Sequence, residues 1–284
     1  MSQEENWNSY LWPSNAGPGE VMLVNLYGLH DPEELARREY SETALRALEL
    51  QLGKVEIPST GDLAEWQAVH SHLFGNVYSW AGELRTVSFT RHDGHYFLHP
   101  QHFAEVIPQV FDAVADLDWA DMTRYQFADN AARLYTLLNW VHPFREGNGR
   151  STRLFLDRQI AAAPYMLDYT RVGAQRWETA AMASRPTKYT WPTNHRPVLA
   201  VFNEIASRRD RSPTELDPLD PLDLQQIIDN ARQSVTSGHA TGAAIDAAGL
   251  NPQQIIDSSP TDLGVADEER ASTVDSSTEL DAGP

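Results

Sequence analysis

Aromatic residues are confined to the first 202 positions of this 284-residue chain. All 27 Phe, Trp and Tyr residues fall in that part, and none follows Phe202. A hydrophobic core requires large apolar side chains, because burial stabilises a fold in proportion to the apolar area removed from water. We therefore expect residues 1–206 to form one folded domain with an N-terminal arm, and residues 207–284 to form a largely disordered tail.

Net charge is divided along the same boundary. The chain carries 22 Lys and Arg against 40 Asp and Glu, a formal net charge of −18, and residues 207–284 account for ten of these negative units. The tail is therefore acidic as well as free of aromatic residues. Polyphosphate backbones attract Lys and Arg, so a chain this acidic is expected not to bind nucleic acid directly.

Several classes of protein are excluded by what the sequence lacks. It contains no cysteine, which rules out disulfides, thiolate nucleophiles and cysteine-bound zinc. It has no run of 18 apolar residues, so no membrane span is expected. Residues 1–5 are acidic and lack an apolar stretch, which argues against a secretory signal. We expect a cytoplasmic protein and leave open delivery to another cell by a route that needs no cleaved signal.

Apolar residues recur at helical spacing through most of residues 31–207, which predicts a mostly helical domain. Residues 1–28 have little periodicity and several turn-forming residues, so they are predicted to form an extended arm. The expected helices cover residues 31–53, 62–74, 100–117, 122–140, 177–184 and 197–207, and a further helix begins near Arg150.

One exposed hairpin is predicted within this helical domain. Residues 85–89 and residues 95–98 are short and β-like, and the five residues between them include Asp93 and Gly94. An Asp-Gly pair between two such segments favours a tight hairpin turn.

The segment richest in chemical groups joins two predicted helices at residues 142–153 and has the sequence HPFREGNGRSTR. Its glycines can adopt the backbone angles that turn successive N–H groups inward, and the helix that follows begins with unsatisfied N–H donors. A glycine-rich turn at a helix N-terminus is an anion site. Arg150 and Arg153 are three residues apart, so we expect both on one face of the helix, where two guanidiniums suit a polyphosphate.

A base and a metal ligand flank this predicted anion site. Glu146 is a lone carboxylate beside the site, an arrangement that holds Mg²⁺ together with phosphate oxygens and water. A neutral imidazole at His142 could accept a proton from an incoming hydroxyl, and Phe144 would anchor the loop inward. The chain has only two lysines and no Walker-type phosphate loop, so arginine would have to hold the phosphates of a nucleotide.

The twelve-residue string resembles the signature of the Fic (Fido) family, H-x-F-x-[DE]-G-N-G-R-x-x-R, at every fixed position. Residues 78–87, YSWAGELRTV, are similar to the W-A-G-x-x-R segment that precedes the flap hairpin of the family. Residues 167–177 resemble the stretch that follows the motif helix in many bacterial members. The likeness covers roughly residues 10–206 and does not extend to the tail.

The resemblance implies an all-α Fic-type helical bundle with a small β-hairpin flap, and transfer of AMP from Mg²⁺-bound ATP to a Ser, Thr or Tyr hydroxyl of a target protein. Its matching positions imply a role for each motif residue. His142 would be the catalytic base and Glu146 the Mg²⁺ ligand. The nucleotide phosphates would be bound by Gly147, Asn148, Gly149, Arg150 and Arg153, and the target would dock on the flap residues Phe89, Thr90 and Arg91.

Many members of the family restrain themselves with an inhibitory helix of the form [ST]-x-x-x-E-[GN], whose glutamate pairs with the second motif arginine. No such string occurs in this chain. The resemblance therefore implies a toxin-like enzyme whose inhibitory glutamate comes from a separate small antitoxin. Two alternatives stay open: a Fic enzyme that uses UTP or GTP, and a catalytically inactive Fic module that only binds a partner.

Overall fold

The computed structural model describes residues 8–89, 95–187 and 193–209 of the chain. Seven α-helices are found in these residues: α2 (Pro32–Gln51), α3 (Leu63–Phe74), α4 (Phe103–Asp112), α5 (Arg124–Val141), α6 (Asn148–Gln159), α7 (Ala174–Ala183) and α8 (Arg196–Ile205). The prediction of a mostly helical domain is confirmed.

Two small antiparallel sheets accompany the helices. One pairs β1 (Leu11–Pro13) with β2 (Val21–Leu23), and the other pairs β3 (Tyr165–Leu167) with β4 (Ala206–Arg208). Single 3-10 turns at Pro100–His102, Trp119–Asp121 and Tyr169–Arg171 lie between the longer elements. The sheets have three-residue strands, so the helices supply most of the core.

Side-chain caps explain where several helices begin. The carboxylate of Asp31 accepts the N–H groups of Glu33 and Glu34 at the start of α2, and Pro32 occupies the first turn. Asp62 caps α3 through the N–H of Glu65. These local signals are readable from the sequence, so the predicted starts of both helices are confirmed.

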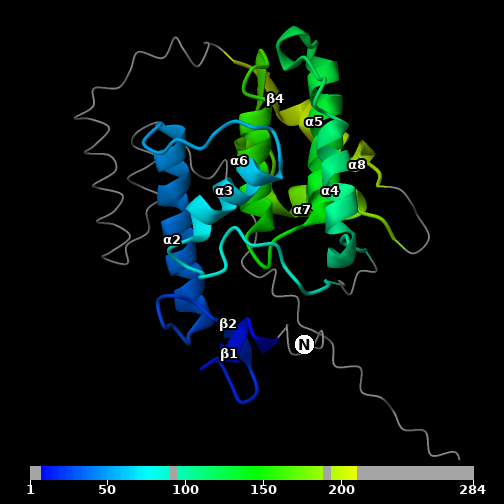
Figure 1. The fold of residues 1–284 in the computed structure, drawn as a ribbon. Helices are drawn as coiled ribbons and strands as arrows, with labels where there is room; N and C mark the ends of the chain where they lie inside the picture. The colour runs from blue at the N-terminus through cyan, green and yellow to red at the C-terminus, as the bar shows by residue number, and fades with distance from the viewer. Residues whose placement is uncertain (1–7, 90–94, 188–192, 210–284) are drawn as a thin grey trace, which may run out of the picture.

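Helix α6 lies in the middle of the fold. Figure 1 shows α6 between α3 and α5, with α2 outside α3 and α8 beyond α5, and the same pairs of helices are in contact. Leu154 of α6 packs into a cluster with residues of α2 and α3, and Phe155 packs into a larger cluster with residues of α5 and α8. Because α6 contributes to both clusters, the middle of this helix is packed on two sides.

The N-terminal segment corrects one prediction. Residues 11–23 form the β1–β2 hairpin instead of an extended arm, with Trp12 opposite Met22. The ring of Trp12 stacks on His30 at a centroid distance of 4.4 Å, and Met22 is buried in the cluster that includes residues of α2 and α3. Strands of three residues are too short to show an alternating pattern, which is why the sequence did not reveal them.

The predicted hairpin of residues 85–89 and 95–98 also needs correction. In the part of the chain that the structure describes, these two segments form no ladder with each other. His95 pairs instead with Thr187, and the N–H of Tyr96 donates to the carbonyl of Pro186 at 3.0 Å. Residues 90–94 lie outside the described residues, and with them the predicted docking residues Thr90 and Arg91.

The predicted tail lies almost wholly outside the described residues, which end at Arg209. Strand β4 crosses the expected domain boundary at residue 206. The side chain of Arg209 donates to the carbonyls of Ala163 and Tyr165, which ties this end of the described chain to the turn after α6. The disorder expected for residues 210–284 stays a prediction.

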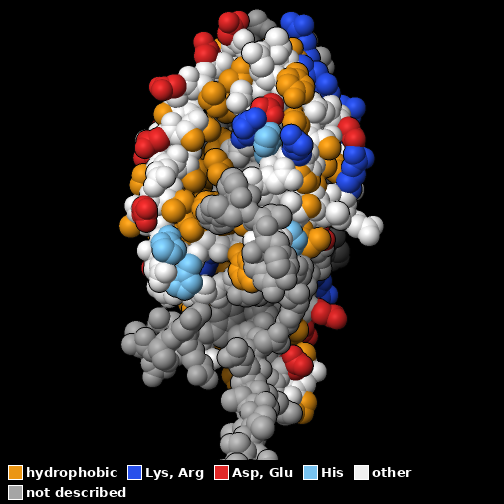
Figure 2. All heavy atoms as spheres, turned by 90° about the vertical axis from the view of Figure 1, so that its right-hand side faces the viewer, with side chains coloured by type: hydrophobic (Ala, Val, Ile, Leu, Met, Phe, Trp, Pro, Cys, Tyr) orange, Lys and Arg blue, Asp and Glu red, His pale blue; other side chains and the backbone are white. Residues whose placement is uncertain are grey.

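Charge is unevenly distributed over the molecular surface. On the face drawn in Figure 2, acidic side chains follow the upper left edge and basic side chains follow the upper right edge. The net negative charge therefore does not prevent local positive regions. Among the helices that the structure describes, none has both the length and the apolar character needed to cross a bilayer.

Candidate active site

His142 ends α5 in a left-handed backbone conformation, with φ 45° and ψ 61°. It is the one non-glycine residue with positive φ in the described part of the chain, a conformation that costs about 1–2 kcal/mol. Two contacts hold it: its N–H donates to the carbonyl of Leu138 at 3.1 Å, and its own carbonyl accepts a bond from Arg85. Strain of this kind persists where the surroundings fix a functional side chain.

The imidazole of His142 lies against the predicted flap. Its ring is 3.9 Å from the ring of Phe97 and 5.9 Å from that of Phe89, measured between centroids. His142 is 8% exposed, so the ring is largely shielded from water. The structure thus places Phe89, one of the predicted docking residues, next to the predicted base.

Gly147 precedes α6 and has φ 75°, the left-handed region that favours glycine. A Cβ atom there would lie 2.2 Å from Cζ of Phe74, so only glycine fits the space. Helix α6 then begins at Asn148, and the N–H groups of its first turn have no partner within the helix. Gly149, in that turn, is exposed. The predicted anion site at a helix N-terminus has the expected backbone form.

Side chains inside the loop hold it closed. The Oδ1 atom of Asn148 accepts the N–H of Phe144 at 2.9 Å, and its Nδ2 donates to the carbonyl of the same residue at 2.8 Å. Phe144 is fully buried, with its ring edge-on to Trp66. Phe144 is therefore the inward anchor that the sequence predicted, and the side chain of Asn148 is engaged within the loop.

Glu146 lies at the lip of this turn. One carboxylate oxygen accepts the N–H of Gly147 at 2.8 Å, and the same oxygen is 3.9 Å from a guanidinium nitrogen of Arg150. The described residues contain no group of three or more His, Cys, Asp or Glu side chains that could hold a metal. A single carboxylate next to an anion site fits Mg²⁺, which commonly takes one or two carboxylates and completes its shell with substrate phosphates and water.

The two motif arginines extend to different neighbours, although the sequence predicted a shared face. Arg150 forms an ion pair with Glu39 of α2, donates to the hydroxyl of Thr43 at 3.2 Å and lies over the ring of Phe74. Arg153 is 3% exposed and lies over the rings of Tyr169 and Trp177. The two long side chains therefore reach different neighbours, although their positions on α6 are only three residues apart.

Burial affects the two guanidiniums differently. Burial lowers the pKa of Arg153 below its ordinary value, although nearby Tyr135 and Tyr169 oppose this. Burial also acts to lower the pKa of Arg150, but the carboxylates of Glu39 and Glu146 outweigh it and raise the pKa overall. Arg150 is therefore held charged by protein carboxylates, a relationship that spacing alone did not indicate.

Arg85 was noted in the sequence only as part of the segment before the flap. Its buried side chain donates to the carbonyls of His142 at 2.7 Å, Leu98 at 2.6 Å and Val87, and its backbone N–H donates to Pro143 at 2.8 Å. It thus joins both ends of the predicted flap to the motif loop. Burial, and to a lesser degree the charge of Arg145, lowers the pKa of Arg85 to about 9, so it remains protonated at neutral pH.

Two further residues near the site had a weak sequence signal. Glu39 lies four residues after Leu35 on the buried side of α2, where an acidic residue is unusual. His70 occupies an apolar position of α3 and is fully buried. Neither pattern indicated a partner, because both partners lie in segments distant in sequence.

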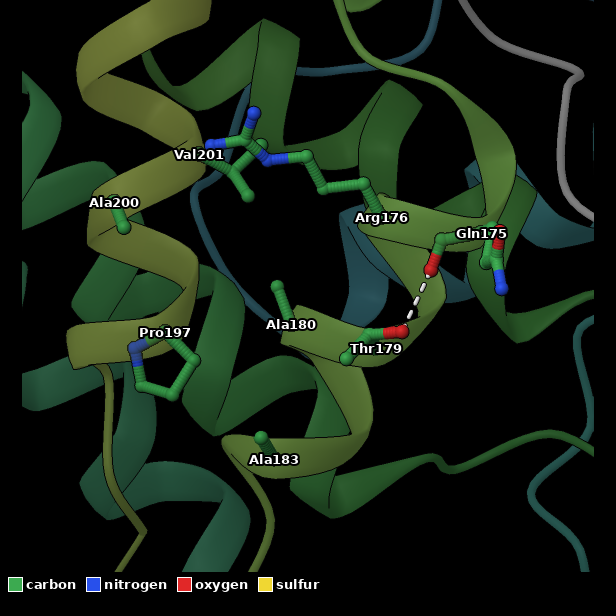
Figure 3. Close-up of a pocket in the computed structure, with 8 residues that line it drawn as sticks. All are labelled: Gln175, Arg176, Thr179, Ala180, Ala183, Pro197, Ala200 and Val201. Atoms are coloured by element: carbon green, nitrogen blue, oxygen red, sulfur yellow. Dashed lines mark hydrogen bonds between the residues drawn. The ribbon is translucent and has the colours of Figure 1, made fainter.

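A groove of about 420 Å³ lies elsewhere, between α7 and α8. Figure 3 shows Arg176 extending across it toward Val201, and the hydroxyl of Thr179 donating to the carbonyl of Gln175. None of its lining residues belongs to the motif. We therefore do not assign it to the candidate active site.

Comparison with known proteins shows the family of this chain. The Fic/DOC family model matches residues 61–160, which include the motif and the segment before the flap. A probable protein adenylyltransferase of Sinorhizobium fredii, y4lH, is 32% identical over 171 residues, which cover 59% of this chain and 85% of that protein. The chain belongs to the Fic/DOC family. Protein adenylyltransferase VbhT of Bartonella schoenbuchensis is 33% identical over 168 residues, and the match spans about a third of its length, 34%.

Solved structures of two Bartonella effector proteins share the fold. The BepC protein of Bartonella tribocorum with bound AMPPNP superposes with a TM-score of 0.60 at 25% identity, covering 72% of this chain and 98% of that one. The N-terminal Fic domain of a Bartonella quintana effector with bound ADP gives a TM-score of 0.59 at 26% identity, covering 72% and 96%. Both of these relatives bind an adenine nucleotide.

Proposed function

We propose that this Fic/DOC protein transfers AMP from Mg²⁺-bound ATP to a Ser, Thr or Tyr hydroxyl of a target protein. The observation that carries the proposal is the closed loop of residues 142–149, which brings a strained histidine, a carboxylate and a helix N-terminus together. The names of its adenylyltransferase relatives and the adenine nucleotides in two related structures support the same reaction.

In the proposed reaction the oxygen of the target hydroxyl attacks the α-phosphorus of ATP. The imidazole of His142 accepts the hydroxyl proton, the bond between the α-phosphorus and the bridging oxygen breaks, and pyrophosphate leaves. The product is an AMP ester of the target side chain. The left-handed backbone of His142 and its contact with Phe97 keep the imidazole in one place, which favours a base that acts by position.

The N–H groups at the start of α6 and the guanidinium of Arg153 would bind the phosphates, and Glu146 would hold Mg²⁺. When bound, Mg²⁺ offsets phosphate charge and orients the pyrophosphate leaving group. In this proposal Arg150 stabilises the site from the side of α2, because Glu39 and Thr43 of that helix engage its guanidinium.

The flap would align the target. An extended segment beside the active site can pair with a target backbone by strand addition, which places the hydroxyl near His142. Phe89 lies close to that ring in the structure, which supports a docking role for the flap. The same role for Thr90 and Arg91 rests on their position in the sequence.

Labelled AMP transfer tests the proposal. The full-length protein is incubated with cell lysate, Mg²⁺ and ATP labelled at the α-phosphate, and labelled bands are compared between wild type, His142→Ala and His102→Ala. His102 is exposed and outside the motif, so its variant serves as the control. We expect His142→Ala to lose labelling and His102→Ala to keep it. Equal labelling by wild type and His142→Ala would contradict catalysis by this site.

The nucleotide is tested in the same assay. Unlabelled ATP is expected to compete with the label more strongly than UTP or GTP, and mass spectrometry of the modified protein is expected to show an AMP adduct on a hydroxyl side chain. Stronger competition by UTP or GTP would assign a different nucleotide to the same chemistry.

We further infer that a separate small antitoxin restrains the enzyme. The support is the lack of an [ST]-x-x-x-E-[GN] string anywhere in the 284 residues. The protein expressed alone is expected to transfer AMP and to slow growth of its host, whereas His142→Ala is expected to do neither. A wild-type protein that is inactive and harmless when expressed alone would contradict this inference.

A further inference from the structure

His70 bridges two segments that flank the candidate active site. Its side chain, on α3, is fully buried. The N–H of Gly82 donates to its Nδ1 atom at 2.9 Å, and its Nε2 atom lies 2.8 Å from the carbonyl oxygen of Glu146. A single imidazole therefore connects the turn before the flap with the peptide group between Glu146 and Gly147.

The two partners determine the proton positions on this imidazole. A backbone N–H can only donate, so Nδ1 must be the unprotonated acceptor. A carbonyl can only accept, so Nε2 must carry the proton. Burial lowers the pKa of His70 to about 3, with the charge of Arg150 acting in the same direction and the bond to the Glu146 carbonyl opposing it. The ring is thus neutral and has one tautomer.

Aromatic packing fixes the plane of the ring. His70 stacks between Phe74, at a centroid distance of 4.7 Å, and Phe144, at 3.9 Å. Phe74 also occupies the space where a side chain at Gly147 would be. The imidazole has little freedom to rotate, so the position of its Nε2–H is set by the core.

We propose that His70 is a positioning residue for the nucleotide site, because its Nε2–H fixes the orientation of the Glu146–Gly147 peptide. This inference deepens the proposed function and rests on it. The carbonyl of that peptide accepts the bond from His70, while its N–H donates to the carboxylate of Glu146. Rotation of the peptide would move both the metal-binding carboxylate and the first N–H groups of α6.

Two amide variants, which both lose the stacked ring, separate positioning from simple packing. Asparagine at position 70 keeps an oxygen near the place of Nδ1 and loses the donor to Glu146, whereas glutamine keeps a nitrogen near the place of Nε2 and loses the acceptor for Gly82. Each variant removes one buried hydrogen bond. A purely structural role therefore predicts similar losses of thermal stability and the same KM for both.

The measurements are the steady-state kcat and KM for Mg²⁺-bound ATP and, by calorimetry, the affinity for AMPPNP with Mg²⁺. We expect His70→Asn to raise the KM for ATP and the Kd for AMPPNP about tenfold, the size of effect seen when support for a metal ligand is removed. We expect His70→Gln to stay close to the wild-type values for both. The KM for the target protein is expected to change in neither variant.

His72 provides a matched control on the same helix. Its Nε2 atom bonds the carbonyl of Arg46 at 2.8 Å, on the side of α2 and away from the motif loop. His72→Asn is expected to lower thermal stability and to leave the KM and Kd for nucleotide unchanged. Equal nucleotide parameters in His70→Asn and His70→Gln would overturn the inference.

The wild-type protein supplies an independent measurement in case His70→Asn does not fold. In its imidazole ¹⁵N spectrum, we expect the Nε2 signal of His70 to shift when AMPPNP and Mg²⁺ are added, and the signal of His72 to stay in place. An unchanged His70 signal would overturn the inference. If wild type transfers AMP but the His70 results fail, only the role of His70 is lost, whereas absence of transfer by wild type overturns the proposed function and this inference with it.

Discussion

The Nε atom of Arg85 lies 2.7 Å from the main-chain oxygen of His142, and the other end of the same guanidinium lies 2.6 Å from the carbonyl of Leu98. One buried side chain therefore bonds both the residue that carries the proposed base and a segment next to the flap. The guanidinium suits this place because its donors are held in a rigid planar fork. A lysine ammonium has three donors on one atom and cannot reach acceptors on both sides.

We predict that Arg85→Lys lowers kcat for AMP transfer about 10- to 100-fold, because a small displacement of the base has a large effect on rate. The free energy of unfolding is expected to fall by about 2–3 kcal/mol as hydrogen bonds from a buried charge are lost. Steady-state kinetics and denaturant unfolding measure the two effects. A wild-type kcat in Arg85→Lys would show that the position of His142 does not depend on Arg85.

Arg133→Lys is the matched control for this substitution. Arg133 is an exposed residue of α5 that pairs with Asp129 at 2.8 Å. An exposed pair contributes little, so its replacement is expected to change the free energy of unfolding by less than about 1 kcal/mol and to leave kcat unchanged.

Glu39→Gln tests the ion pair between Glu39 and Arg150. The carboxylate of Glu39 accepts from both Arg150 and the hydroxyl of Tyr78, so glutamine would leave a largely buried guanidinium with only the more distant carboxylate of Glu146, at 3.9 Å, as counter-charge. We expect the free energy of unfolding to fall by about 3 kcal/mol in denaturant titration. Glu34→Gln, at an exposed position of the same helix, is expected to have little effect. Equal stability of both variants would show that Arg150 does not depend on Glu39.

Gly147→Ala is predicted to destabilise the protein by about 3 kcal/mol, because the positive φ and the ring of Phe74 both oppose a Cβ atom. Thermal and denaturant unfolding measure the loss. Gly173, the N-cap of α7, has an ordinary φ and open space where a Cβ would be, so Gly173→Ala is expected to cost less than about 1 kcal/mol. A stable Gly147→Ala would mean that the loop can adopt another conformation.

Asp157 makes stability depend on pH. Burial raises its pKa to about 7, although the Tyr169 hydroxyl and the charges of Arg209 and Arg153 oppose this. The folded state therefore holds the proton more tightly than the unfolded state. The stability contributed by the protonated form is complete below about pH 4 and is lost as pH rises through 7.

Replacing Asp157 with Asn removes the buried charge and keeps an acceptor for Tyr169. We predict that the free energy of unfolding of Asp157→Asn, relative to that of wild type, increases by about 2 kcal/mol as the pH is raised from 5 to 8. This value is reduced because the side chain is partly exposed. Denaturant unfolding at both pH values measures the gain. Asp116→Asn, at an exposed position, is expected to show no such difference. If the stability of Asp157→Asn relative to wild type does not change with pH, the raised pKa of Asp157 is contradicted.

The candidate site could be predicted from sequence where its chemistry is local. The motif places His142, Phe144 and Glu146 within five residues, and the glycine conformation at Gly147 is encoded in the residue type itself. Helix starts capped by Asp31 and Asp62 could be predicted for the same reason. In each case the interacting groups are neighbours in the chain, so spacing is sufficient.

The predictions that needed correction depend on partners far away in the sequence. The segment at His95 pairs with Thr187 and not with residues 85–89, and an Asp-Gly turn signal carries no information about a competing partner 92 residues later. Arg150 and Arg153 were expected on one face, but that spacing did not indicate their different neighbours, Glu39 for Arg150 and the rings of Tyr169 and Trp177 for Arg153.

The sequence by itself determined that a folded aromatic domain precedes an acidic segment, and that one loop carries a base, a carboxylate and an anion-binding turn. Tertiary structure alone decided which side chains hold that loop in place. Arg85, His70 and Glu39 act through backbone carbonyls or through a charge on another helix, and such contacts leave no periodic or spacing signal. They form only when packing of α2, α3 and α6 brings distant segments within hydrogen-bond distance.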